Sequence, residues 1–402
     1  MRIIDISVTN FKSFARLDKL KLTKVNMVFG LNNSGKSNLL KLIEIIFRVK
    51  RNPESITQAI VDEKLATYTN VSEGNFWLGW IENEPFIFRS NNRNEPITFS
   101  FTIGLSNDEI ISLGSTGVNL LSNFPMFGSE HILNFSGDII SINNFVSKMR
   151  VTDVVFNKIK IFDGKVYFPT IQASELLFDN QDSFDSLMSL MNNCVKFLDN
   201  DRYFDHEKED SKLKTLSSRN VKNWLFNMSL EGFNQSKYKE LIKMISTFSM
   251  KGDQLFKENE KSSPFSNWEI EFERIGEEIE IFFKNEFNRY PISSYGTGVQ
   301  QIFFILLSIF YSKSKIILIE EIELNLSPKY QYELLQFIKN LSDNGANISQ
   351  LVFTTHSPLF CYRGDFNLLK VTINNDGASV VVDVKRSDLE DFTNVAKLMI
   401  QE

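Results

Sequence analysis

A short glycine-containing segment, Gly30 to Ser37, constrains the fold of this chain more than any other feature. Its sequence, GLNNSGKS, fits the pattern G-x-x-x-x-G-K-S. The stretch 22–29 before it is typical of a strand, and apolar residues recur at helical spacing from Leu39 to Phe47 after it. A strand, a glycine loop and a helix in this order predict an α/β fold with a phosphate-binding loop.

The residue types in this loop suit a nucleoside triphosphate. Gly30 and Gly35 allow the backbone to turn tightly, so that successive N–H groups point at phosphate oxygens. The helix that begins here adds the positive end of its dipole. Lys36 is expected to reach the β- and γ-phosphates, and the Ser37 hydroxyl is expected to bind Mg²⁺. The predicted nucleotide contacts in this loop are Asn32, Asn33, Ser34, Gly35, Lys36, Ser37 and Asn38.

A second pattern places carboxylates at the end of a buried strand. The segment Ile316 to Glu323, IILIEEIE, is a short apolar strand that ends in adjacent acidic residues. We expect Glu320 to hold Mg²⁺ through water and Glu321 to polarise the attacking water. For Glu323 the sequence leaves a functional and a structural interpretation open.

A histidine follows another predicted buried strand. His356 comes directly after residues 350–355, and a polar residue at such a strand end faces the ligand crevice of an open α/β sheet. Its imidazole is therefore expected to contact the γ-phosphate or to orient the attacking water. The chain has three histidines, and His131 and His206 have no comparable context.

A small-residue segment, Ser294-Tyr-Gly-Thr-Gly298, lies just before an apolar helical pattern. Exposed N–H groups at a helix N-terminus can bind an anion. Simple N-capping of the helix is the alternative interpretation, and the segment alone does not decide between them.

The character of the chain changes twice and predicts three parts. Residues 1–174 are expected to form an N-terminal ATPase lobe with a mixed sheet, and residues 291–402 a C-terminal lobe. Residues 175–290 are polar and mostly helical in pattern, and they predict an inserted helical arm. The predicted class is α/β, with a mixed and parallel sheet flanked by helices.

The hydrophobic pattern also predicts individual elements. A hairpin with an Asp163-Gly164 turn is expected over 153–169. An amphipathic helix is expected over 268–287, and a closing helix over 387–401. Further helices are expected over 299–311 and 328–340, and strands over 350–355, 367–373 and 378–384.

Charge and composition limit the classes of partner. The chain of 402 residues has a net charge of −6, which argues against bulk electrostatic binding to nucleic acid. Residues 1–52, however, hold eleven basic and three acidic residues, a local charge of about +8. This stretch is either a solvated face with one phosphate-binding lysine or a surface that faces DNA or RNA.

Targeting and redox signals are absent from the sequence pattern. The two cysteines, Cys194 and Cys361, have no metal-binding or disulfide spacing. No signal-peptide pattern and no apolar run of about 18 residues is present, so we expect a cytoplasmic protein that does not span a membrane.

Taken together, the motifs resemble a known family. The order FKSF, GxNNSGKSNLL, SSYGTGxQQ, IEExExxLSP, TTHSP is similar to the ABC-type ATPase heads of SMC and RecF-like proteins. It looks most like the overcoming-lysogenization-defect (OLD) class of ATPases. The resemblance covers about residues 1–50 and 290–360, and the middle of the chain matches only in placement.

This resemblance implies ATP and Mg²⁺ as ligands and a homodimer or higher homo-oligomer. In the family, two heads trap ATP between the phosphate loop of one and the signature of the other. Carried over here, Ser294, Gly296 and Gly298 would contact the γ-phosphate of the opposite head. Lys12 and Ser13 would lie near the nucleotide, as the family's KSF turn does.

Some positions depart from the family pattern. Glu320 replaces the commoner aspartate, Tyr295 stands where many relatives have glycine, and Asn325 and Ser327 replace frequent histidines. The family's Q-loop glutamine is not identifiable in this sequence. Slow hydrolysis, used as a switch, would agree with these departures.

The resemblance leaves three hypotheses for the biological role. About 45 residues follow His356, too few for the Toprim nuclease domain of full-length OLD nucleases, and ATPases of this type without it resemble the ATPase subunits of anti-phage systems such as PARIS and Septu. The first hypothesis is therefore an ATP-switched sensor or scaffold that binds a separate effector protein through residues 175–290 or a sheet edge. The second is a DNA-repair or chromosome-associated ATPase that binds DNA, and the third is a nucleotide-dependent interaction module without hydrolysis.

Overall fold

A computed structural model gives the structure of most of residues 1–174 and 291–402 and of parts of the segment between them. The described residues are 1–47, 76–82, 87–112, 130–141, 146–162, 191, 194–200, 221–230, 238–239, 269–276, 278–284, 289–311, 315–339, 341, 348–363 and 366–385.

The N-terminal part forms a seven-stranded antiparallel sheet. Its order is β2-β1-β5-β6-β7-β4, with β8 paired to β7. Alternate residues of β5, from Ile97 to Ile103, are buried, which is the period expected when one face of a sheet covers a core. The strands are β1 (Arg2–Phe11), β2 (Phe14–Lys21), β4 (Phe76–Glu82), β5 (Ile97–Leu105), β6 (His131–Ser141), β7 (Val146–Phe156) and β8 (Ile159–Phe162), with the short elements η2 (Arg89–Asn91) and α3 (Asn107–Ile111) beside them.

A second sheet of six strands forms the centre of the molecule. Its order is β16-β15-β3-β14-β13-β9, and every neighbouring pair is parallel except β15 and β16. All residues of β13 and β14 are buried, which explains why their sequences are apolar without alternation. The strands are β3 (Val25–Phe29), β9 (Val195–Leu198), β13 (Ile316–Ile319), β14 (Gln350–Thr355), β15 (Asn367–Ile373) and β16 (Ser379–Asp383).

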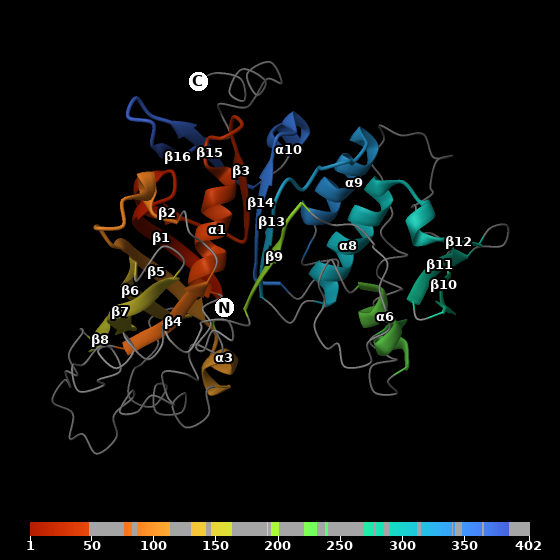
Figure 1. The fold of residues 1–402 in the computed structure, drawn as a ribbon, viewed down its shortest axis with the longest axis horizontal. Coiled ribbons are helices and arrows are strands. Elements are labelled where there is room, and N and C mark those ends of the chain that lie inside the picture. The colour runs from red at the N-terminus through yellow and green to blue at the C-terminus, as the bar shows by residue number, and fades with distance from the viewer. Residues whose placement is uncertain are drawn as a thin grey trace.

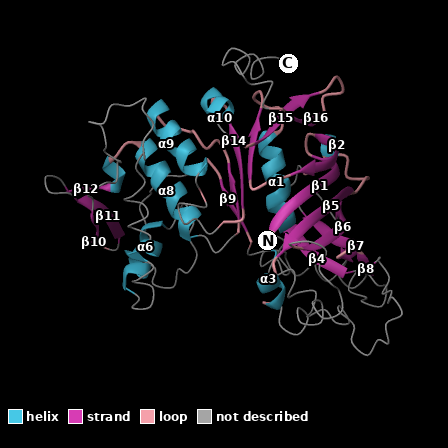
Figure 2. Ribbon diagram, turned by 180° about the vertical axis from the view of Figure 1, so that it is seen from behind, coloured by secondary structure: helices cyan, strands magenta, loops and turns pink. Residues whose placement is uncertain are grey.

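Helices cover both faces of the parallel sheet. Helix α1 (Lys36–Phe47) lies between the two sheets, and its Phe47 ring meets Phe101 of β5 edge-on at 5.4 Å (Figure 1). Helices α8 (Thr297–Tyr311), α9 (Pro328–Lys339) and α10 (Pro358–Arg363) lie on the opposite face, as the view from behind also shows (Figure 2). One hydrophobic core therefore fills each side of the central sheet. The predicted α/β class, with a mixed and parallel sheet flanked by helices, is confirmed.

The outermost layer consists of helix α6 and a small sheet. Helix α6 (Val221–Leu230) packs beside the antiparallel strands β10 (Glu269–Ile275), β11 (Glu278–Lys284) and β12 (Arg289–Pro291) (Figure 1). The helix predicted over 268–287 is therefore wrong, because these residues form a hairpin that turns at Gly276. Apolar and charged residues alternate from Glu269 to Glu273 and from Glu278 to Ile281, with Phe272 opposite Ile281, so the true period there is two. The described part of 175–290 does not confirm a helical arm.

Three further predictions concern single elements of the fold. Strand β9 falls inside the predicted arm, yet it pairs in parallel with β13 of the central sheet. The hairpin of β7 and β8 turns at Asn157 and Lys158, both with positive φ, before the predicted Asp163-Gly164 turn, which lies outside the described residues. The helix predicted over 387–401 also lies outside the described residues.

The predicted elements of the C-terminal lobe agree with the structure. Helices α8 and α9 and strands β14, β15 and β16 lie within two residues of the predicted ranges. None of the helices in the described ranges has the length and apolar character that crossing a membrane requires.

Candidate functional site

The central sheet brings three sequence motifs to one edge. Strands β3, β14 and β13 are adjacent and parallel, so their carboxyl ends lie side by side. The glycine loop follows β3, Glu320 follows β13, and His356 follows β14. Ligands of open parallel sheets bind outside this edge. The strand pairing thus assembles a site from segments separated by about three hundred residues.

The glycine loop is held in a conformation that requires glycine. Gly35 has a φ of +107°, and a Cβ atom there would lie 2.3 Å from the Ser379 Oγ and 2.6 Å from the Ser13 Oγ. A Cβ at Gly30 would lie 2.2 Å from the carbonyl oxygen of Val371. The loop is therefore packed from behind by β15 and β16, and the Ser379 hydroxyl donates to the Ser34 carbonyl at 2.5 Å.

The turn at Lys12 and Ser13 is docked against this loop. The amide of Asn38 donates to the Ser13 Oγ at 2.8 Å, and the Ser13 carbonyl accepts the N–H of Ser379. Lys12 adopts a left-handed conformation with a φ of +47°, and its N–H donates to the Ile87 carbonyl at 2.7 Å. The structure thus places the predicted KSF turn beside the first turn of α1.

Lys36 lies buried at the mouth of the loop. Only 6% of the residue is exposed, and its Nζ donates to the carbonyl oxygens of Gly30 at 3.0 Å and Leu31 at 2.7 Å. Burial lowers the pKa of this ammonium, whereas the carboxylates of the β13 loop act in the opposite direction. Those carboxylates, in order of effect, are Glu321, Glu323 and Glu320. The positive charge and the acidic cluster are therefore close enough to interact.

The carboxylates are held by the neighbouring strands. The N–H of Glu320 donates to the Leu198 carbonyl of β9 at 2.9 Å, which continues the sheet by one residue. Glu321 has a φ of +44°, unusual for a residue other than glycine, and its N–H donates to the Thr354 Oγ1 at 2.7 Å. Such backbone strain persists where the surrounding structure enforces it. Here Thr354 of β14 supplies that constraint.

Glu323 and His356 join the two strand ends. One Glu323 oxygen accepts the backbone N–H of His356, while its other oxygen, Oε2, is buried and has no hydrogen-bond partner within the described residues. The His356 Nε2 lies 3.8 Å from the Glu321 Oε1, and each side chain is about one-third exposed. The structure therefore shows a structural contact for Glu323 and places the imidazole beside the carboxylate predicted to polarise water.

The donor set fits a magnesium nucleotide. Ser37 is exposed in the first turn of α1, where backbone N–H groups have no partner inside the helix. Among the described residues, no cluster of three or more His, Cys, Asp and Glu side chains could hold a metal by itself. Mg²⁺ commonly binds through one or two protein groups together with water and substrate phosphates. A hydroxyl at Ser37 and a carboxylate at Glu320 agree with that mode.

The signature segment, Ser294 to Gly298, has a different local structure from the glycine loop. Residues Ile292 to Ser294 form a single 3₁₀ turn, η4, and α8 begins at Thr297. Ser294 and Gly296 are exposed, and a Cβ at Gly296 would meet no atom within 4 Å. Gly298 is buried, and a Cβ there would lie 2.6 Å from the Asn325 carbonyl. The signature helix thus packs closely on the loop that follows Glu321.

Sequence reasoning missed residues that only the sheet pairing reveals. Asp199 and Asn200 follow β9 beside Glu320, and the Asn200 Oδ1 is buried with no hydrogen-bond partner in the part of the chain that the structure describes. The strand before them has four residues, VKFL, too few for a periodic signal. Thr354 lies within the TTHSP motif, but nothing in the motif indicated its contact with Glu321, and Ser379 begins β16 without any motif.

The remaining histidines do not join the site. His131 is buried, its Nε2 lies 2.7 Å from the Asn107 Oδ1, and its Nδ1 lies 2.9 Å from the Asn157 amide nitrogen. It also stacks on the Phe156 ring, and burial lowers its pKa. His131 is thus a core residue of the antiparallel sheet. His206 lies outside the described residues.

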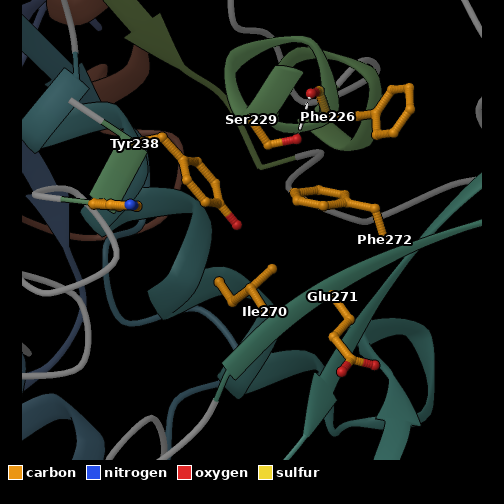
Figure 3. Close-up of a pocket in the computed structure, with 7 residues that line it drawn as sticks. Phe226, Ser229, Tyr238, Ile270, Glu271 and Phe272 are labelled. Atoms are coloured by element: carbon orange, nitrogen blue, oxygen red, sulfur yellow. Dashed lines mark hydrogen bonds between the residues drawn. The ribbon is translucent and has the colours of Figure 1, made fainter. Parts of the chain in front are cut away.

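A pocket of about 460 Å³ lies in the outermost layer, between α6 and β10. The aromatic rings of Phe226, Phe272 and Tyr238 line it, and the Tyr238 hydroxyl points into it (Figure 3). The ring centroids of Phe226 and Phe272 are 5.7 Å apart. The residues that line the pocket lie before the signature segment in the sequence, and none of them comes from the phosphate loop.

The parallel sheet, the glycine loop and the opposed carboxylates define a P-loop nucleotide-binding protein. The sequence model of the AAA ATPase domain matches residues 1–361, and the chain belongs to that family.

Two solved structures are similar to this chain at low identity. The SMC head domain from Thermotoga maritima is 14% identical, with 96% of this chain and 100% of that chain covered and a TM-score of 0.43. The Smc head domain with an extended coiled coil bound to the C-terminal domain of ScpA, from Pyrococcus furiosus, is 12% identical, with 96% of each chain covered and a TM-score of 0.47. No curated protein matches the chain.

Proposed function

We propose that this protein binds and hydrolyses ATP at the carboxyl edge of its parallel sheet. The observation that carries the proposal is the position of Lys36. Its ammonium is buried at the mouth of the glycine loop, and three carboxylates from β13 act on its charge. A buried cation beside exposed helix N–H groups suits the β- and γ-phosphates of a nucleotide.

The residues of the site have separable roles in this proposal. Lys36 binds phosphate oxygens, and Glu321 accepts a hydrogen bond from the attacking water and orients it. His356, 3.8 Å from Glu321, contacts the γ-phosphate or the same water. Ser37 and Glu320 would hold Mg²⁺, which when bound would neutralise charge on the phosphate oxygens. The backbone constraint at Glu321 aims its carboxylate before the nucleotide arrives.

The exposed signature supports a homodimer or a higher homo-oligomer. Ser294 and Gly296 face solvent before the N-terminus of a fifteen-residue helix. That position offers a hydroxyl, backbone N–H groups and the positive end of a helix dipole to an anion. We propose that Ser294, Gly296 and Gly298 complete the nucleotide site of a second copy of this chain.

We further propose that hydrolysis is slow and serves as a switch for a separate effector protein in anti-phage defence. The order of motifs and their departures from the family pattern support this role. The outer layer of α6 and β10–β12 adjoins the signature and is a surface through which an effector could sense the nucleotide state.

A second candidate, an ATPase that acts on DNA, rests on the edge strand β2. Arg16, Lys19, Lys21 and Lys24 are exposed on this strand or just after it. Arg16 is partly neutralised by Asp18, with 2.6 Å between the Arg16 Nε and the Asp18 Oδ2. A group of exposed cations can contact a phosphate backbone.

One set of measurements tests both candidates. ATP hydrolysis is measured for the wild type and Glu321→Gln, with and without duplex DNA, at low and high salt. Turnover that is lost in the variant supports the proposed site, and DNA stimulation that falls steeply with salt favours the second candidate. A wild type that binds ATP and never hydrolyses it would contradict the enzyme proposal and leave an interaction module.

An ATP-bound variant that does not hydrolyse its nucleotide tests for the effector. Glu321→Gln with ATP is expected to accumulate the closed dimer, and a pull-down from the native source should recover a specific protein partner. Recovery of DNA alone would contradict the effector proposal.

A further inference from the structure

The signature segment is flanked by an aromatic cluster that the proposed reaction does not use. The Tyr295 ring lies between Ser294 and Gly296 in sequence, and its centroid is 5.6 Å from that of Phe283 on β11 and 6.4 Å from that of Tyr290 on β12. Phe283 in turn meets Phe303 of α8 edge-on at 5.1 Å. Edge-to-face rings at these separations attract one another and define an orientation.

Hydrogen bonds hold the backbone around Tyr295, and its ring packs on the small sheet. The Tyr295 N–H donates to the Ile292 carbonyl, and the Gln300 Nε2 donates to the Tyr295 carbonyl at 2.8 Å. These bonds tie the segment to itself and to α8. Gly296, the next residue, has open space where a side chain would be. The Tyr295 ring therefore adds a side-chain contact between the exposed segment and the small sheet, beside the contacts that η4 makes with β11.

The small sheet of β10–β12 is held by buried rings and by ion pairs. Phe283 is 1% exposed and Phe303 is fully buried. Arg289 of β12 lies 3.7 Å above the Phe282 ring and pairs with Glu271 and Glu273 of β10. β12 leads directly into the signature, so all three strands are linked to the residues proposed to meet the nucleotide.

We propose that Tyr295 is a positioning residue: its ring fixes the exposed backbone of Ser294 and Gly296 on the β10–β12 sheet, so that the segment is preformed to meet the nucleotide of a second copy. This inference rests on the proposed function. It also explains the presence of tyrosine where a glycine would suffice for backbone shape, because a glycine offers no ring to the small sheet.

The test separates positioning from folding and from nucleotide binding. In Tyr295→Ala, ATP binding to the monomer, followed with a fluorescent ATP analogue, should stay within about two-fold of the wild type, because Lys36 and its loop are untouched. Turnover should fall by about 10- to 100-fold, the range in which a misplaced contact affects a reaction. In the Glu321→Gln background, the ATP-dependent dimer should weaken in parallel.

Two variants serve as matched controls. Tyr295→Phe keeps the ring and should restore turnover and dimerisation to near the wild-type level. Tyr238→Ala removes a half-buried tyrosine ring that packs on Phe272 in the same layer but lies in the α6 pocket (Figure 3). It should change turnover by less than about two-fold if the effect belongs to the signature.

Three results would overturn the inference. They are wild-type turnover in Tyr295→Ala, loss of ATP binding together with turnover, and an equal loss in Tyr238→Ala. Each is distinguishable from failure of the proposed function. If the wild type does not hydrolyse ATP, the proposed enzyme fails, whereas the ATP-dependent dimer of the wild type and Tyr295→Ala still tests the positioning role.

Discussion

The phosphate loop and the signature segment differ in how the protein holds them. The loop is packed against β15, β16 and the Ser13 turn so closely that neither Gly30 nor Gly35 has room for a Cβ atom. The signature is open on the side of Ser294 and Gly296 and is supported on one side by an aromatic cluster. One half of the proposed site is thus complete within a single chain, and the other half faces outward. This difference is what a site shared between two copies requires, and the predictions below test it.

The largest expected effect is at the enclosed half. Lys36→Ala should reduce ATP affinity and turnover by at least about 100-fold, because it removes the charged donor expected to bind the β- and γ-phosphates. Lys41→Ala, on the same helix, is the matched control, since Lys41 pairs with Glu44 away from the loop. Isothermal titration and phosphate release measure the two effects. Normal affinity in Lys36→Ala would contradict the nucleotide site altogether.

A pair of glycine substitutions compares the two halves directly. Gly35→Ala should destabilise the fold by about 1–3 kcal/mol, because the new Cβ clashes with two hydroxyls at a positive φ. Gly296→Ala should leave stability within about 0.5 kcal/mol of the wild type, because nothing occupies the space around it. Chemical denaturation measures both values. Equal destabilisation would remove the distinction between an enclosed and an open half.

Gly296→Ala has a second expected outcome. The added methyl group faces the surface proposed to meet a second copy, so the ATP-dependent dimer should weaken and turnover should fall although the monomer is stable. Analytical ultracentrifugation with and without ATP provides the measurement. A stable variant with unchanged dimerisation and turnover would show that the open segment does not contact the nucleotide of another head.

A smaller effect is expected for Thr354, whose hydroxyl accepts the hydrogen bond of the Glu321 N–H. Thr354→Val removes the acceptor of the Glu321 N–H while keeping the shape of the side chain, so the strained backbone at Glu321 loses its restraint. Turnover should fall by about ten-fold, and stability by about 1 kcal/mol. ATP affinity should stay near that of the wild type, since Lys36 is unaffected. Loss of affinity equal to the loss of turnover would argue against a role limited to Glu321.

The smallest expected effect is a pH dependence of folding stability. It arises from Glu333 on α9, the helix that follows the Glu321 loop. Glu333 is buried, and burial raises its pKa from 4.5 to about 7. The folded state therefore binds more protons than the unfolded state between these pH values, and stability falls as pH rises through this window.

Glu333→Gln removes that titration. At pH 8 the variant should be more stable than the wild type by about 1 kcal/mol, a value reduced for partial solvent screening. At pH 4, where the carboxyl is largely protonated in both states, the difference should be much smaller. Urea denaturation at the two pH values is the measurement, and a difference that does not change with pH would contradict the assigned cause.

Sequence patterns predicted the α/β class and the segments that form the candidate site, but not every element around them. Gly30–Ser37, Glu320, Glu321 and His356 were recognisable because each motif is local and lies next to a strand with a strong apolar signal. The hairpin of β10 and β11 was not, because isoleucine and phenylalanine recur at intervals that agree with a helical period as well as with alternation.

The sequence alone determined which residues can carry the chemistry. A lysine after a glycine loop, adjacent carboxylates and a histidine at strand ends are chemical properties of short segments, and they do not depend on the rest of the chain. Tertiary structure alone decided which segments meet. Strand order set β9 beside β13, Thr354 behind Glu321 and Ser379 against the loop, because parallel pairing joins residues far apart in sequence, and no local pattern encodes the partner of a strand.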